Sequence, residues 1–416
     1  MTISPSSLLG QATASGSMAH LEPGCGSSSH ETLPTSSISS RRTTPTFPRA
    51  RSLLLSSTLW VEASLPLTVS QLVGSAPKSR ACSPGRTRLP VWQLAAMTSV
   101  DPNLLSMYMP PMEAAVALDT VMEVAFLRLM MPASCWKSMR WLNIGPERKL
   151  KAAHTVLGEF VTEMLERRKI NTCPVGNDEE EEVVDIISSF INDPDYADDD
   201  LGQAMIISYM LAARDTVGTT LTWLFYNLTQ NPDIISIIRK ELSPVASRKV
   251  AAGARAMLTF EPDDIESLVY LRATLYETLR LYPPAPLEIK MVAADDILPS
   301  GHKVHAGDTI LISILSTRRM KSVWGNDCLD YNPSRWLTED GNNIRYVPSH
   351  KFLAFNSGPR MCLGKNIAIM QMKTVIAAVL WNFDVQVVEG QSIQPKPSCI
   401  LEMKNGLILK LKKRDM

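Results

Sequence analysis

The segment from Asp198 to Gln230 places the strongest constraint on how this chain can fold. Its first residues, 198–200, are all aspartates, and carboxylates stabilise the free N–H groups at a helix N-terminus. Asn231-Pro232 stops the helical pattern at the other end. A helix of this length measures roughly 45 Å, enough to cross a whole domain. Because the segment is apolar on most sides, we expect it to be buried.

The remaining pattern predicts further helices and a small amount of strand. Gly145-Pro146 opens one helix, and two more are expected at 265–282 and 363–381. Strands are expected near 304 and 309–312, after a turn at 299–301, and a hairpin over 384–413 around Asn405-Gly406. The fold class is therefore mainly α with small β-sheets.

Composition excludes several classes of protein. The 42 basic and 42 acidic residues cancel, so the chain has no overall basic field for nucleic acid. It contains no run of 18 apolar residues, so we expect no membrane-spanning helix. The seven cysteines are odd in number, widely spaced and without C-x-x-C, which favours a reducing compartment over a disulfide framework.

Residues 1–95 differ from the rest, being rich in Ser, Thr, Pro and Arg and poor in acids. A disordered tail, a transit peptide, a truncated relative's end and a segment read in the wrong frame or across a misplaced exon boundary all remain open. The globular texture begins at about residue 96.

The segment 355–364 carries the sharpest chemical signal, FNSGPRMCLG. It predicts a glycine-bearing loop that delivers Cys362 to the start of a helix, where N–H groups and the helix dipole lower a thiol pKa. Gly358 and Gly364 allow a close approach, and Arg360 supplies a cation for an anionic group. A lone cysteine before a helix is usually only a buried side chain.

These residues match F-x-x-G-x-R-x-C-x-G, which resembles the haem-binding loop of the cytochrome P450 family, through Phe355, Gly358, Arg360, Cys362 and Gly364. Such a match arises by chance on the order of once in ten thousand random chains. Glu277-Thr278-Leu279-Arg280 and Pro333-Ser334-Arg335-Trp336 resemble two further family motifs, in the family's order. The resemblance implies a structural triad of Glu277, Arg280 and Arg335. Glu277 and Arg280 lie on one helical face, where they can pair.

Within the long helix, residues 212–216 resemble the family's oxygen-activation motif. The resemblance implies proton-relay roles for Asp215 and Thr216, beside Ala212 and Ala213 at the cofactor. The alternative for Thr216 is a hydroxyl bonded to the preceding helical turn. The family most often has Gly at the position of Ala213. The alanine stiffens this turn of the helix.

The resemblance covers roughly residues 97–416 and implies a partial haem domain with the family's helical prism. It also implies haem b (iron protoporphyrin IX) held by Cys362, and NADPH–cytochrome P450 reductase as electron donor. The sequence resembles most closely the plant fatty-acid and alkane hydroxylase clan, and mid-chain alkane hydroxylases in particular. An apolar long-chain substrate is expected in a pocket lined by Met205, Ile206, Tyr209, Met210, Pro286 and Leu287.

Family members are anchored to the cytosolic face of the endoplasmic reticulum membrane and begin with helices that cover the haem. Residues 1–95 show neither the anchor nor those helices. Two functions therefore stand: a monooxygenase that hydroxylates alkanes or fatty acids, and a truncated, haem-poor and inactive relative.

Two weaker signals carry no function. His302 and His305 lack nearby partners for a zinc site, and Trp136 with Arg140 only imitates the family's propionate-binding motif.

Overall fold

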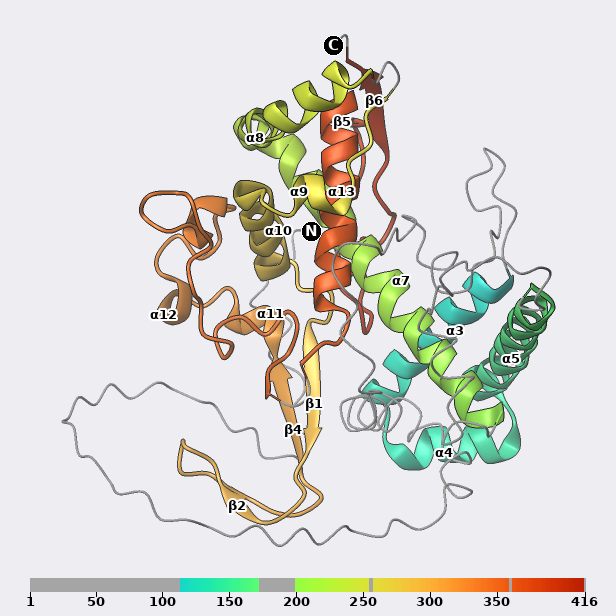
Figure 1. Cartoon of the computed structure of the whole chain (residues 1–416). Coiled ribbons are helices and arrows are strands. Elements are labelled where there is room, and N and C mark those ends of the chain that lie inside the picture. Colours follow the sequence, from blue (N-terminus) through green and yellow to red (C-terminus); the bar gives the residue numbers. More distant parts are fainter. Residues whose placement is uncertain (1–112, 172–198, 254–256, 359–360, 415–416) are drawn as a thin grey trace, which may run out of the picture. The chain divides into compact units, whose positions relative to one another are not determined.

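The computed structural model describes residues 113–171, 199–253, 257–358 and 361–414 (Figure 1). By their contacts the described residues fall into two units, one formed by 288–312 and the other by the remainder. The atypical residues 1–95 lie outside the described part of the chain.

Helices dominate the larger unit, which confirms the mainly α fold class. No helix in the described ranges is both long enough and apolar enough to cross a bilayer. The longer helices are α3 (Glu113–Met130), α4 (Ala133–Leu142), α5 (Gly145–Asn171), α7 (Asp199–Gln230), α8 (Pro232–Ala251), α10 (Val269–Leu281) and α13 (Lys365–Asn382). The short ones are α9 (Pro262–Ile265), α11 (Ile314–Thr317), α12 (Lys321–Trp324) and the 3₁₀ turn η4 (Pro333–Trp336).

The long helix α7 has the expected length and end point. It runs for 32 residues, and Pro232 begins α8 directly after it. Leu224 and Leu228 on α7 are fully buried, as the apolar pattern predicted. The helix expected at 265–282 is shorter than predicted, because Leu268 is extended and separates α9 from α10.

Two hydrophobic clusters form the core of this unit. The first joins the second half of α7 to α8, α10 and α13. The second joins the first half of α7 to α3 and α5. Because α7 contributes to both, it is the element around which the helices of the unit pack.

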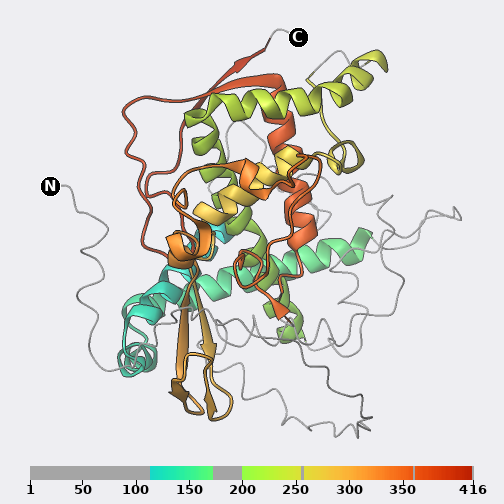
Figure 2. The same ribbon diagram turned by 90° about the vertical axis from the view of Figure 1, so that its left-hand side faces the viewer.

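The smaller unit is a pair of β ribbons. Strands β1 (Leu287–Met291) and β4 (Thr309–Ser313) pair and lie side by side in both views (Figures 1 and 2). Strands β2 (Asp296–Ile297) and β3 (Lys303–Val304) form a second, antiparallel ladder. Gly301 turns between them with φ of 83°, a conformation that favours glycine, so the turn expected at 299–301 is confirmed.

The C-terminal hairpin is wider than its turn signal indicated. Strands β5 (Phe383–Val387) and β6 (Leu409–Lys413) pair antiparallel from Phe383↔Lys413 to Val387↔Leu409. Asn405-Gly406 does form a turn, with Gly406 at φ of 68°. However, that turn follows a local Pro395↔Met403 bridge and lies within a long excursion between the two strands, so it does not join them directly.

A buried ion pair on α10 organises the segment that follows β4. Glu277 and Arg280 have fully buried side chains, and Nε and Nη2 of Arg280 donate to the two carboxylate oxygens of Glu277, at 2.8 Å each. The remaining N–H groups of Arg280 donate to the carbonyls of Arg318, Cys328 and Asp330. All five guanidinium N–H groups are therefore satisfied, which a buried cation requires.

The Glu277 carboxylate likewise accepts several hydrogen bonds. Besides Arg280, it accepts from the Asn332 backbone N–H at 3.0 Å and from the Trp336 indole at 2.8 Å. Arg335 adds a longer contact at 3.4 Å. The three residues of the expected triad thus lie together.

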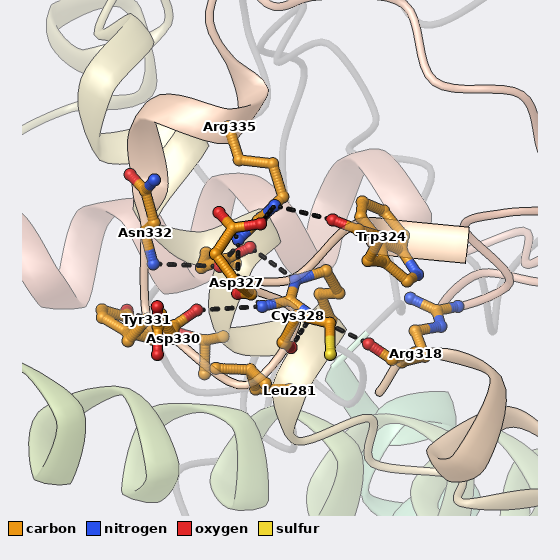
Figure 3. Close-up of polar contacts among 12 residues, drawn as sticks. Leu281, Arg318, Trp324, Asp327, Cys328, Asp330, Tyr331, Asn332 and Arg335 are labelled. Carbon is orange, nitrogen blue, oxygen red and sulfur yellow. Dashed lines mark hydrogen bonds and ion pairs between the residues drawn. The ribbon is translucent and has the colours of Figure 1, made fainter. Parts of the chain in front are cut away.

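The main partner of Arg335 is Asp327, which the sequence motifs did not single out. Arg335 bonds both carboxylate oxygens of Asp327, at 2.7 and 3.1 Å, and the Trp324 carbonyl at 3.2 Å (Figure 3). These bonds hold the pKa of the Asp327 carboxyl below its usual range. Asp327 and Arg335 lie near the two ends of the same loop, so their pairing joins those ends. The contact of Arg335 with Glu277 then links the loop to α10.

Arg318 is the exception to this pattern of satisfied charge. Arg318 is 1% exposed and stacks on Phe352, with the guanidinium carbon 4.6 Å from the ring centre. Both terminal nitrogens lack a hydrogen-bond partner among the described residues. Burial, together with the Arg280 charge, lowers the Arg318 pKa to about 9. A buried unpaired cation of this kind costs folding free energy.

We expect Glu277→Ala to destabilise the fold by about 3–5 kcal/mol, because it leaves the Arg280 charge buried without a counter-charge. Urea unfolding followed by circular dichroism measures the loss. Glu339→Gln is the control, since Glu339 lies just after η4 but is exposed. It should change stability by less than about 0.5 kcal/mol. Equal unfolding midpoints for wild type and Glu277→Ala would contradict a structural role for the ion pair.

We expect the opposite sign for Arg318→Leu, a gain on the order of 1–3 kcal/mol, because it removes buried donors that bond nothing. The penalty is fully present below pH 9 and falls as pH rises from about 9 toward 12.5. The gain should therefore be smaller at pH 10 than at pH 7. Arg319→Leu is the matched control and should destabilise, since Arg319 donates to the Leu281 carbonyl. A destabilised Arg318→Leu protein would refute this account.

Candidate functional site

Cys362 lies in a closed loop that leads into α13. Its backbone N–H donates to the Phe355 carbonyl at 2.8 Å, which joins the two ends of the glycine-bearing segment. Between them Asn356 and Gly358 both have left-handed backbone, with φ of 59° and 68°. Gly358 is therefore required by conformation rather than by lack of space, since a Cβ there would meet nothing within 4 Å. Arg360 lies outside the described residues.

The N-terminus of α13 lowers the pKa of the Cys362 thiol less than the sequence position of the cysteine indicated. Helix α13 begins at Lys365, with Gly364 as its N-cap, three residues after Cys362. Burial raises the Cys362 pKa, while the Gly364 backbone N–H and the Lys365 charge lower it. The net direction is upward, so the expected lowering by the helix terminus is present but outweighed. The free thiol is therefore neutral at physiological pH.

The loop suits a prosthetic group that brings its own metal ligands. Cys362 is solvent-accessible, and no group of three or more His, Cys, Asp or Glu side chains capable of holding a metal ion occurs in the described ranges. A single thiolate is a sufficient protein ligand for an iron porphyrin, whose nitrogens supply the rest. The neighbours Met361 and Leu363 are each more than half exposed and offer apolar contact. The residues present thus fit haem better than a bare metal ion.

The motif on α7 occupies an unbroken stretch of helix. Thr216 donates its hydroxyl to the Ala212 carbonyl at 2.7 Å, which is the bond to the preceding turn that the sequence left as an alternative. Ala213 stands within the same turn, and the helix continues regularly past it. The hydroxyl oxygen of Thr216 retains lone pairs that can accept a hydrogen bond.

Asp215 is the most buried member of a charged group on the same stretch. Its side chain is 11% exposed, against 33% for Arg214 and 59% for Asp119 of α3. Burial raises the pKa of Asp215, and the Arg214 charge lowers it, while Asp119 and Glu402 raise it further. The carboxyl therefore holds a proton more readily than an exposed aspartate does. Asp119 is 95 residues from Arg214 in sequence, so no local pattern identified it.

The Cys362 loop and the α7 motif share one hydrophobic cluster. Val217 and Leu221 of α7 and Phe355 of the loop all pack against the first core cluster.

Some of the residues expected to line a substrate pocket lie in another part of the structure. Ile206 and Met210 are buried in the second cluster, between α3 and α5. They therefore contribute to the core there, and Met205 beside them is buried as well.

Comparison with known proteins agrees with these motifs. A sequence model described as Cytochrome P450 matches residues 106–411. Alkane hydroxylase MAH1 of Arabidopsis thaliana is 37% identical over 324 residues, which cover 76% of this chain and 62% of that protein. Noroxomaritidine synthase 2 of Narcissus pseudonarcissus is also 37% identical, over 325 residues covering 77% of this chain and 62% of the relative. Cytochrome P450 86B1 of Arabidopsis thaliana is 34% identical over 325 residues, 76% of this chain and 57% of its own length.

The chain thus spans about three fifths of the length of the curated relatives it matches. The match to the family nevertheless extends over both candidate motifs and the buried ion pair, from before α3 to β6. These findings confirm what the motifs predicted: the chain belongs to the cytochrome P450 family.

Proposed function

We propose that this chain is a haem-thiolate monooxygenase that hydroxylates unactivated C–H bonds of long-chain alkyl substrates. The observation that carries the proposal is the loop closed by the Phe355–Cys362 backbone bond, which presents one accessible thiol ahead of α13. When bound, haem supplies the activation of dioxygen, with electrons from NADPH through a separate reductase. The remaining steps concern what the chain's own residues do.

Cys362 must lose its proton to bind iron. Because burial raises the thiol pKa, ligation releases a proton that the free protein keeps. The Gly364 N–H and the Lys365 ammonium stabilise the resulting thiolate. Arg360 is proposed to pair with an anionic group of the cofactor, as in the family's motif.

Asp215 and Thr216 are proposed to deliver protons during turnover. Burial raises the pKa of Asp215, so its carboxyl carries a proton to a higher pH than an exposed aspartate does. Thr216 follows it directly, and its hydroxyl oxygen can accept a hydrogen bond while donating to Ala212. Ala212 and Ala213 carry no bulk, so they leave space beside this pair for the cofactor.

A long-chain alkane is the proposed substrate, with fatty acids as the second choice. The names of the relatives include an alkane hydroxylase, and the motif texture points to the same clan. The relatives also include a noroxomaritidine synthase, so the test of substrate class needs a comparison with compounds that are not alkyl chains.

We expect the reduced, CO-treated protein to show the red-shifted Soret band of thiolate-ligated haem, and Cys362→Ala to abolish it. Cys135→Ala is the matched control, because Cys135 is an exposed cysteine on α4, outside the loop, and the band should survive there. An intact band in Cys362→Ala would remove Cys362 as the ligand. A wild-type chain without any band would instead support the alternative of a haem-poor, inactive relative.

Substrate class can be tested by optical titration of the haem-loaded protein. We expect very-long-chain alkanes, and fatty acids more weakly, to produce the type I shift of a displaced iron ligand. Their apolar chains should bind through burial of methylene groups, each worth about 0.8 kcal/mol. Affinity should therefore rise with chain length. A shift with compact aromatic compounds and none with alkanes or fatty acids would overturn the proposed substrate.

A further inference from the structure

One guanidinium group on α7 is shared between two carboxylates from different helices. Nη1 of Arg214 lies 2.7 Å from Oδ1 of Asp119 on α3, and the same nitrogen lies 3.3 Å from Oδ1 of Asp215. The shorter contact goes to the more exposed carboxylate. Asp119 therefore draws the Arg214 charge toward α3 and away from its buried neighbour.

The other charged groups near Asp215 do not replace this cation. Glu402, in the excursion between β5 and β6, faces Asp215 and disfavours its ionised form. Lys396 in the same excursion is occupied by Glu402 at 3.8 Å and by Glu123 of α3 at 3.6 Å. Arg214 is thus the cation that acts on Asp215, and Asp119 is its closest competitor for that charge.

We propose that Asp119 is a positioning residue for the proton-carrying group of this protein: by holding Arg214 from α3, it limits how strongly that guanidinium neutralises Asp215. The role of this proton in turnover rests on the proposed function. The competition of Asp119 and Asp215 for the Arg214 charge does not. Removing the Asp119 carboxylate acts on Asp215 in two ways with the same sign. Arg214 becomes available to Asp215, and a repelling negative charge disappears.

The consequence is a link between the packing of α3 and the protonation of Asp215. With Asp119 in place, Asp215 keeps its proton to a higher pH than it would without that carboxylate. If α3 moves away, Arg214 turns to Asp215 and stabilises the carboxylate. Helix α3 thereby sets whether the proton is held, through one ion pair rather than through any contact with the reacting atoms.

The titration of Asp215 can be read from stability, without catalysis. The folded pKa of Asp215 is raised above the ordinary value of 3.8, so ionisation costs stability as pH rises from 3.8 through the folded pKa. The difference in thermal midpoint between Asp215→Asn and wild type should therefore rise over that window and then level off. The full chain would be scanned from pH 4 to pH 8.

The same difference is then measured in an Asp119→Asn background, by comparing the single variant with the Asp119→Asn/Asp215→Asn double variant. We expect the rise with pH to flatten or reverse, because the Asp215 pKa falls. In an Arg214→Gln background the rise should extend to higher pH. Asp119→Glu keeps the carboxylate and should restore the wild-type curve. Coinciding curves for wild type and Asp119→Asn would overturn the proposal.

Glu123→Gln provides the matched control. It sits one turn further along α3 and also loses a cross-element ion pair, but it does not contact Arg214. Its Asp215 curve should match wild type. A curve flattened as much as in Asp119→Asn would mean that loosening α3 suffices, and the proposal would fail. Because these measurements need no haem, a confirmed curve in a protein without turnover would refute the proposed function alone.

Discussion

The pairing of Glu277 with Arg280 is the interaction on which the candidate site depends. The carboxylate holds the Trp336 indole N–H, and the Trp336 ring packs edge-on against Phe352, with centroids 4.6 Å apart. Phe352 stands three residues before Phe355, where the cysteine loop begins. A pair buried in α10 is therefore connected, by one hydrogen bond and one ring contact, to the segment that presents the thiol.

Because the candidate site depends on this pair, the complete hydrogen bonding of Glu277 and Arg280 matters more than the charges themselves. A buried ion pair is no better for stability than a well-packed apolar pair, but removing one partner is severe. Every guanidinium N–H of Arg280 is used, and three of these bonds go to the backbone carbonyls of Arg318, Cys328 and Asp330. The charges thus specify one path for the chain. Arg318, stacked on Phe352 with its terminal nitrogens unbonded, shows the cost of a buried cation that lacks such partners.

Desolvation also decides the state of the two groups proposed to do chemistry. It is the largest influence on both Cys362 and Asp215, and in each case it favours the neutral form. At Cys362 this keeps a proton on the sulfur of the free protein, which the proposed iron ligation would release. At Asp215 it keeps on the carboxyl the proton that the proposed relay would use. The nearby cations, Lys365 and Arg214, moderate both effects, and the second of these is itself controlled from α3 by Asp119.

Local sequence determined the elements and the motif residues. Helix period, an aspartate start and Asn231-Pro232 were enough to predict α7, because these signals act within a few residues of the backbone they shape. The i,i+3 spacing predicted the Glu277–Arg280 pair for the same reason. Cys362, Asp215 and Thr216 were found by family resemblance, since their spacing in sequence records a shared arrangement that no periodicity reveals.

Tertiary structure alone decided which distant groups meet. Asp327 became the main partner of Arg335, and Asp119 reached Arg214 from another helix. Ile206 and Met210 were expected in a pocket but pack in the core between α3 and α5, and β5 pairs with β6 well beyond the Asn405-Gly406 turn. Each outcome depends on how separate elements pack against one another. Hydrophobic period and turn chemistry describe one element at a time, so they carry no information about that choice.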